Sequence, residues 1–151
     1  MTVVVQRILR GSVTADGKPA GRASAGLLLL IGVREGDSEQ DALVLAAKIA
    51  RLRIFVDENG KMNRSVQDIG GEILAVSNFS LCADASHGNR PSFTAAMAPD
   101  HTKALYERFC EALREEGVPV ETGVFGASMT IDPILDGPIT ILLTAEKGKI
   151  L

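Results

Sequence analysis

The residues most able to do chemistry in this sequence lie in the segment SNFSLCAD at 77–84, where Ser77, Asn78 and Ser80 follow an apolar run. If the segment is a strand, Ser77 and Phe79 point to one face, and Asn78 and Ser80 point to the other. A hydroxyl beside an amide could hold a carbonyl or a ribose hydroxyl. The alternative is a polar strand end that faces water, which is common in half-buried strands.

Two further segments place an aromatic residue where it could meet a ligand. In HGNRPSF at 87–93, Arg90 precedes a proline and Phe93 follows it, so the arginine could pair with a phosphate and the ring could stack on a base. The alternative is a surface loop anchored by one buried ring. In GVFGASM at 123–129, small residues surround Phe125, which indicates a close backbone approach either to a ligand or to another strand.

The pair Gly137-Pro138 interrupts an apolar run near the end of the sequence, in ILDGPIT. Pro138 has no N–H to donate to a sheet, and Gly137 takes unusual backbone conformations without steric cost. A plain turn is one interpretation, although a two-residue hairpin does not place proline second. The pair can instead present two backbone carbonyls where a side chain could not. The sequence leaves open whether the bond before Pro138 is cis.

Familiar nucleophile and cofactor arrangements are missing from the sequence. It contains no Gly-x-Ser-x-Gly elbow and no glycine-rich phosphate loop. Its two cysteines, Cys82 and Cys110, and two histidines, His87 and His101, form no cluster, so we expect neither a metal site nor a cofactor. So few cysteines argue against a disulfide framework and favour a reducing cytoplasm.

Length and charge narrow the class of protein further. The 151 residues predict one domain, and a hydrophobic fraction of 46% is ample for a core. The longest apolar run, 27–31, cannot span a bilayer, and the first residues do not resemble a signal peptide, so we expect a cytoplasmic protein without membrane contact. A net charge of −3 argues against binding DNA or a long stretch of RNA, but not against holding a short single-stranded end.

Strand patterns dominate the two ends of the chain. We expect strands at 2–9, 26–33 and 72–83, the second buried on both faces, and a further strand after the Gly-Pro pair. A hairpin is expected over 12–24 with its turn near Asp16-Gly17. A polar hairpin or loop is expected over 57–71, and a loose end over 146–151.

Two segments have helical spacing. The first is capped by Asp37 or Ser38 and ends near Leu52. The second covers 99–117, with Asp100 as its cap and a glycine as its stop signal. Together with the strands, they predict an α+β domain with six or more strands and two amphipathic helices.

In chain order, these segments resemble the D-aminoacyl-tRNA deacylase family. The resemblance runs from residue 2 to about residue 143 and is carried by two motifs. Ser77-Asn78-Phe79-Ser80-Leu81 stands where the family has Ser-Gln-x-Thr-Leu, and Leu135-Asp136-Gly137-Pro138 stands where it has Asn-x-Gly-Pro. The resemblance implies a single domain over 1–151, with mixed and antiparallel sheets that form a barrel-like core beside the two helices.

The resemblance also implies a homodimeric hydrolase that cleaves the ester between a D-amino acid and the 3′-terminal adenosine of tRNA. Glycyl-tRNA mischarged on tRNA-Ala would be cleaved as well, because glycine has no side chain to reject. The Gly-Pro bond would be cis, and the carbonyls of Gly137 and Pro138 would bind the substrate ammonium in the partner subunit's pocket. The side chain of an L-residue would then strike this rigid backbone.

The resemblance assigns catalysis to the segment from Ser77 to Ser80, where backbone N–H groups near Phe79 and Ser80 would stabilise the oxyanion. We favour attack by water, assisted by the ribose 2′-hydroxyl, over a Ser80 nucleophile, because no base to activate Ser80 is evident. The implied contacts to the tRNA 3′ end come from four residues: Arg90, Phe93, Phe125 and Met129.

Three departures from the family pattern keep alternatives open. Asn78 replaces Gln, Ser80 replaces Thr, and Leu135 replaces Asn. A second hypothesis is therefore a non-catalytic module that binds the tRNA 3′-terminal adenosine or a related metabolite. A third is a Cys82-dependent hydrolase of another ester or thioester.

Overall fold

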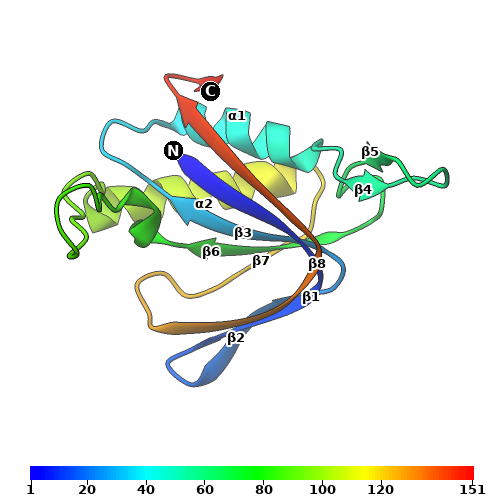
Figure 1. Cartoon of the computed structure of the whole chain (residues 1–151), viewed down its shortest axis with the longest axis horizontal. Coiled ribbons are helices and arrows are strands. Elements are labelled where there is room, and N and C mark those ends of the chain that lie inside the picture. Colours follow the sequence, from blue (N-terminus) through cyan, green and yellow to red (C-terminus); the bar gives the residue numbers. More distant parts are fainter.

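The computed structural model describes all 151 residues and consists of a curved mixed sheet with two helices on one face (Figure 1). The helices are α1 (Glu39–Ala50) and α2 (Pro99–Glu115), and a short 3₁₀ turn, η1, covers Phe79–Cys82. The strands of the sheet are β1 (Thr2–Ala15), β2 (Lys18–Ala23), β3 (Gly26–Gly32), β6 (Glu72–Ser77), β7 (Val120–Thr122), β8 (Met129–Glu146) and β9 (Lys149–Ile150). A separate hairpin pairs β4 (Phe55–Val56) with β5 (Met62–Arg64).

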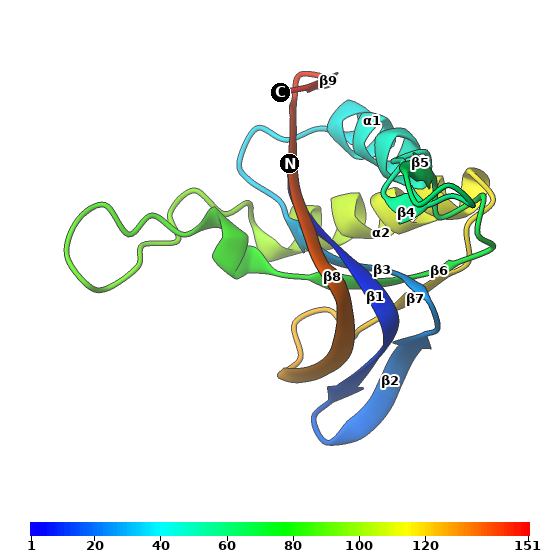
Figure 2. The same cartoon turned by 45° about the vertical axis from the view of Figure 1, so that its right-hand side comes forward.

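The sheet runs in the order β7-β6-β3-β1-β8-β9, with β2 paired to the far half of β1. Strands β3, β6 and β7 are parallel, whereas β1 is antiparallel to β2, β3 and β8. The long ribbon of β1 and β8 bends away from the helices and, with β2, curls into a half-barrel (Figure 2). The predicted α+β fold with a barrel-like core is confirmed.

Strand β3 separates two cores, as expected for a strand buried on both faces. Leu27, Leu29 and Ile31 face the helices within a cluster of 25 buried residues. Leu28 points the other way into a cluster of six, together with Leu74 of β6. Because a strand alternates its side chains, one apolar run can supply both cores.

Both helices lie near the predicted positions, but only the first cap was predicted correctly. Ser38, one of the two residues expected to cap the first helix, caps α1 and forms a capping box with Asp41. The N-cap of α2 is Ala98, with Pro99 in the first turn, so the prediction of Asp100 as the cap was wrong. The fixed φ of proline suits the first helical turn, and Asp100 instead lies within that turn, where the helix dipole favours a carboxylate.

Three strand predictions need correction. The strand expected over 72–83 ends at Ser77, and the segment 146–151 is not loose, because β9 pairs with the end of β8. The pair Gly137-Pro138 lies inside the continuous strand β8 and does not precede it. The pairing of β1 and β8 shifts there, so that 136–139 lie opposite Arg7 alone. A bulge of this kind tolerates a proline inside a sheet.

Candidate functional site

A cavity of about 680 Å³ opens where β6 ends, beside the first turn of α2. Its floor is apolar and comes mainly from β3, β6 and β8, and its rim carries the polar residues that follow β6. Fourteen residues line it: Leu30, Val76, Ser77, Asn78, Phe79, Ala96, Met97, Pro99, Thr102, Phe125, Gly126, Ala127, Met129 and Ile131. A mostly apolar cavity with a few polar groups at one edge is typical of a small-molecule site.

The polar edge is formed by η1 and not by the end of a strand. Asn78 caps η1, because its Oδ1 accepts the Ser80 N–H at 3.2 Å. The Ser80 hydroxyl donates to the same oxygen. The predicted alternation of Ser77 and Phe79 against Asn78 and Ser80 was therefore wrong. A short polar side chain that bonds the backbone two residues on competes with the ladder of a sheet.

The structure contains no activated side-chain nucleophile at this edge. The Ser80 hydroxyl donates to an amide oxygen, which is not a base. The Cys82 thiol is buried and donates to the Val33 carbonyl at 3.3 Å. Burial raises the pKa of Cys82, so the thiol stays protonated at neutral pH. The groups that remain at this edge to act on a substrate are the N–H donors of the backbone.

One backbone donor of this turn has no acceptor within the chain. The N–H of Asn78 donates to the Ile31 carbonyl at 2.8 Å, and the N–H of Leu81 donates to the Asn78 carbonyl at 3.3 Å. The Ser80 N–H is bonded to the Asn78 side chain. Among 78–81, only the Phe79 N–H remains unpaired. An unpaired amide at a cavity edge is the kind of donor that stabilises a developing oxyanion.

Of the four residues expected to meet a tRNA end, two line the cavity. Phe125 and Met129 are part of its wall. Phe93 lies at its margin, where its ring packs edge-on against Phe79 with centroids 5.0 Å apart. Both of these rings remain substantially exposed, so Phe93 is not the buried anchor of the loop that we considered. Arg90 does not line the cavity and makes no ion pair, so it stays a candidate only.

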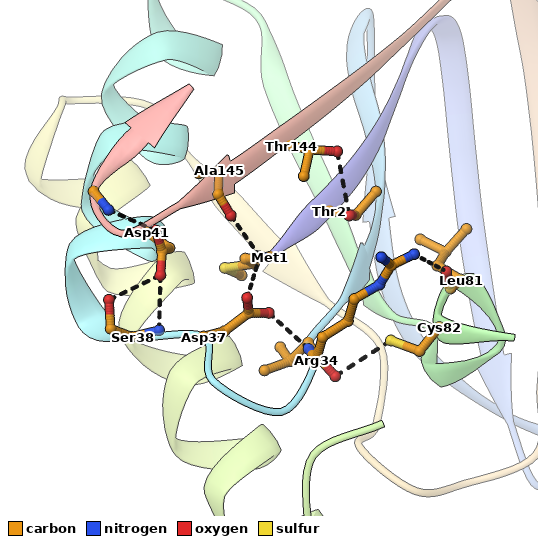
Figure 3. A network of polar contacts seen from close by, with 12 residues as sticks. Met1, Thr2, Arg34, Asp37, Ser38, Asp41, Leu81, Cys82, Thr144 and Ala145 are labelled. Carbon is orange, nitrogen blue, oxygen red and sulfur yellow. Dashed lines mark hydrogen bonds and ion pairs between the residues drawn. The ribbon is translucent and has the colours of Figure 1, made fainter. Parts of the chain in front are cut away.

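A network of polar contacts connects η1 to the segment that follows β3 and to the N-terminus (Figure 3). Figure 3 shows the Arg34 guanidinium directed at the Leu81 carbonyl, 3.5 Å away, beside the thiol of Cys82. The backbone N–H of Arg34 donates to Asp37 at 2.6 Å. Asp37 also pairs with the ammonium of Met1, which donates to a carbonyl of β8 at 2.8 Å. The turn is thus tied to β1, β3 and β8.

Gly137 and Pro138 do not line the cavity of their own chain. The bond between them is cis, and Gly137 has φ +126°. The bulge that holds them is anchored by Arg7, whose Nε lies 2.8 Å from Asp136 Oδ2 in an ion pair without hydrogen-bond alignment. Arg7 also donates from Nη1 to the Ile54 carbonyl at 2.7 Å. Arg7 was not among the site residues expected from the sequence, although a charged residue within an apolar strand was a signal for it.

The chain matches a family described as D-Tyr-tRNA(Tyr) deacylase over residues 4–144. The chain belongs to this family. Proteins named D-aminoacyl-tRNA deacylase are close relatives. One from Paracoccus denitrificans is 55% identical over 93% of this chain and 95% of its own length, and one from Deinococcus radiodurans is 54% identical over 95% and 99%. A solved structure titled c-Myc DNA Unwinding Element Binding Protein aligns with TM-score 0.89 and 37% identity, over 96% of this chain and 99% of that one.

The family membership confirms the resemblance drawn from the two motifs. The residues that depart from the family pattern lie in different surroundings. Asn78 and Ser80 are bonded to each other, whereas Leu135 is 43% exposed on β8, one residue before the bulge.

Two general properties also come from the structure. No group of three His, Cys, Asp or Glu side chains comes together in a way that could hold a metal ion. None of the helices has the length and apolar character needed to cross a membrane.

Proposed function

We infer that the chain hydrolyses the ester between a D-amino acid and the 3′-terminal adenosine of tRNA. The observation that carries this function is the sequence similarity to proteins named D-aminoacyl-tRNA deacylase. More than half of the aligned residues are identical, over nearly the full length of both chains. The cavity adds a chemical reason, because an apolar wall that can take a base adjoins an unpaired backbone donor that can take an ester oxygen.

The terminal adenosine enters the cavity with its base against the wall that contains Phe125 and Met129. An aromatic ring and a polarizable thioether suit the flat face of a purine. The exposed rings of Phe79 and Phe93 stand at the entrance, where the penultimate base or the ribose would pass. Arg90, in the loop after η1, is free to pair with a phosphate of the tRNA end.

Hydrolysis needs no side-chain nucleophile. Water attacks the ester carbonyl, the carbonyl oxygen gains negative charge, and the Phe79 N–H donates to it. The tetrahedral intermediate then expels the ribose oxygen, which takes up a proton and leaves tRNA and free amino acid. The 2′-hydroxyl of the ribose assists the water. The Ser80 hydroxyl is already a donor to Asn78 and has no base beside it, which favours this route over a serine ester.

Chirality is selected by Gly137 and Pro138 of a second copy of the chain. Their carbonyls bind the substrate ammonium, so an L side chain meets backbone and a D side chain points away. Glycine escapes rejection, so glycyl-tRNA mischarged on tRNA-Ala is a second substrate. A homodimer is required because these residues lie outside the cavity of their own chain. Exposed apolar side chains supply a surface for it: Leu9 on β1, and Ile134, Leu135 and Leu142 on β8.

The experiment compares deacylation of D-tyrosyl-tRNA and L-tyrosyl-tRNA by the purified protein, with and without a chelator, while light scattering reports the oligomeric state. We expect rapid loss of the D-ester alone, unchanged by chelator, and light scattering should report a dimer. In a separate fractionation of cells, the protein should be found in the cytoplasmic fraction. Binding that protects the ester from hydrolysis would instead favour the non-catalytic module. Equal loss of both esters would refute the chiral role of Gly137-Pro138.

A further inference from the structure

The wall of the cavity that contains Phe125 belongs to a connection with few backbone contacts. This connection, residues 123–128, joins β7 to β8 and pairs with no strand. Three backbone hydrogen bonds hold it, written here with the N–H donor first: Gly123 to Ala75, Ala127 to Val124, and Asp16 to Ser128. The position of the Phe125 ring therefore depends on the side chains that pack behind it.

Tyr106 of α2 is bonded at the point where this connection begins. Its hydroxyl donates to the Ala75 carbonyl at 2.9 Å, and the same oxygen accepts the Gly123 N–H at 3.1 Å. A carbonyl oxygen has two lone pairs, so it can satisfy both donors. Burial raises the pKa of Tyr106, so the hydroxyl stays protonated and remains a donor at neutral pH.

The ring of Tyr106 lies behind the ring of Phe125. Their centroids are 6.1 Å apart and their planes are tilted by 39°, within the range of favourable aromatic pairs. Tyr106 is buried and does not line the cavity, whereas Phe125 is half-buried and does line it. Tyr106 therefore supports the cavity wall without reaching a bound substrate.

We propose that Tyr106 is a positioning residue for substrate binding, which holds the Phe125 wall against which the terminal base of the tRNA stacks. It acts through its ring on Phe125 and through its hydroxyl on the oxygen that holds Gly123. The proposal rests on the deacylase function above and on the placement of the base at Phe125. Because Tyr106 acts through Phe125, its effect on binding should vanish when the Phe125 ring is removed.

The test is a double-mutant cycle of Tyr106→Leu and Phe125→Ala, with KM and kcat measured for D-tyrosyl-tRNA. We expect Tyr106→Leu to raise KM about fivefold, within the range of one aromatic pair, and to change kcat less than twofold. In the Phe125→Ala background, the same substitution should change KM less than twofold. Tyr106→Phe keeps the ring and should recover most of the loss.

Phe109→Leu is the matched control for a loss of stability alone. Phe109 is a fully buried aromatic residue three positions further along α2, in the same core cluster. Both leucine variants should lower Tm because each removes buried volume, but Phe109→Leu should keep the wild-type KM. An unchanged KM in Tyr106→Leu would overturn the proposal. An equal rise of KM with and without the Phe125 ring would overturn it as well.

Amide hydrogen exchange of the free protein provides a readout that needs no substrate. Exchange at Ala127, which lies in the wall, should quicken more in Tyr106→Leu than in Phe109→Leu, because only the first variant loosens the connection locally. Equal exchange at Ala127 in the two variants would refute the support of the wall by Tyr106. Absence of turnover by the wild type would instead refute the deacylase function, and the exchange data would still decide whether Tyr106 holds the wall.

Discussion

Replacing Gly137 by alanine tests whether the backbone of the β8 bulge takes part in the reaction. Gly137 has φ +126°, a conformation that residues with a Cβ rarely adopt. A Cβ built there would lie 2.6 Å from the Ile139 nitrogen and 2.8 Å from the Ile139 Cγ1. The nitrogen belongs to the backbone, so the bulge itself must shift to admit the methyl group.

The cost of this substitution is estimated from the strain of its backbone. A residue with a Cβ held in a sparsely populated φ/ψ region costs about 1–3 kcal/mol. With a total stability of roughly 5–15 kcal/mol the variant stays folded at 25 °C, and each kcal/mol lowers Tm by about 2–4 °C. Gly17→Ala is the matched control, since Gly17 has φ +77° in the β1–β2 turn with nothing within 4 Å of its added Cβ.

The assay is deacylation of D-tyrosyl-tRNA and L-tyrosyl-tRNA by both variants at 25 °C, beside thermal unfolding. We expect Gly17→Ala to lose about 1 kcal/mol of stability, from its left-handed backbone alone, and to keep wild-type kcat/KM. Gly137→Ala should lose at least tenfold in kcat/KM for the D-ester, because the carbonyls of the bulge move by the shift that its Cβ requires. Wild-type turnover and chirality in Gly137→Ala would refute the assignment of the gate to this backbone.

Three further predictions follow from single contacts. Burial raises the pKa of Asp41, but hydrogen bonds from Gly148 and Ser38 outweigh it and hold this pKa below its usual range. The stabilisation is therefore present above about pH 4 and is lost as pH falls further; Asp41→Asn should flatten the acid limb of a denaturation-versus-pH profile and cost about 1–2 kcal/mol at pH 7. Cys82→Ala should keep deacylation within twofold, since the thiol is protonated and buried; a hundredfold loss would support the cysteine hydrolase. Phe125→Ala should raise KM about tenfold with little change in kcat, from stacking worth about 1–3 kcal/mol per base, and an unchanged KM would remove the base from that wall.

Most of the fold could be predicted because its elements carry local signals. The β1–β2 turn lies at Asp16-Gly17, where both residues have positive φ, and Ser38, which caps α1, was one of the two caps expected from the sequence. The buried strand β3 was equally clear from its continuous apolar run. The failures came where two local signals competed, as at Asn78, whose side chain takes the backbone out of the strand that the apolar run favoured.

The candidate site, like the fold, could be predicted from the sequence only in part. The sequence by itself determined the family, the motif around Ser77 and Ser80, and the presence of an unusual Gly-Pro pair, because these depend on residue type and order alone. Only the tertiary structure decided that Phe125 and Met129 share a cavity with that motif, that Gly137 lies outside this cavity, and that Arg7 holds the bulge. The physical reason is that cavities and ion pairs join residues distant in the chain, and the register of β1 against β8 that brings them together is a property of the whole sheet.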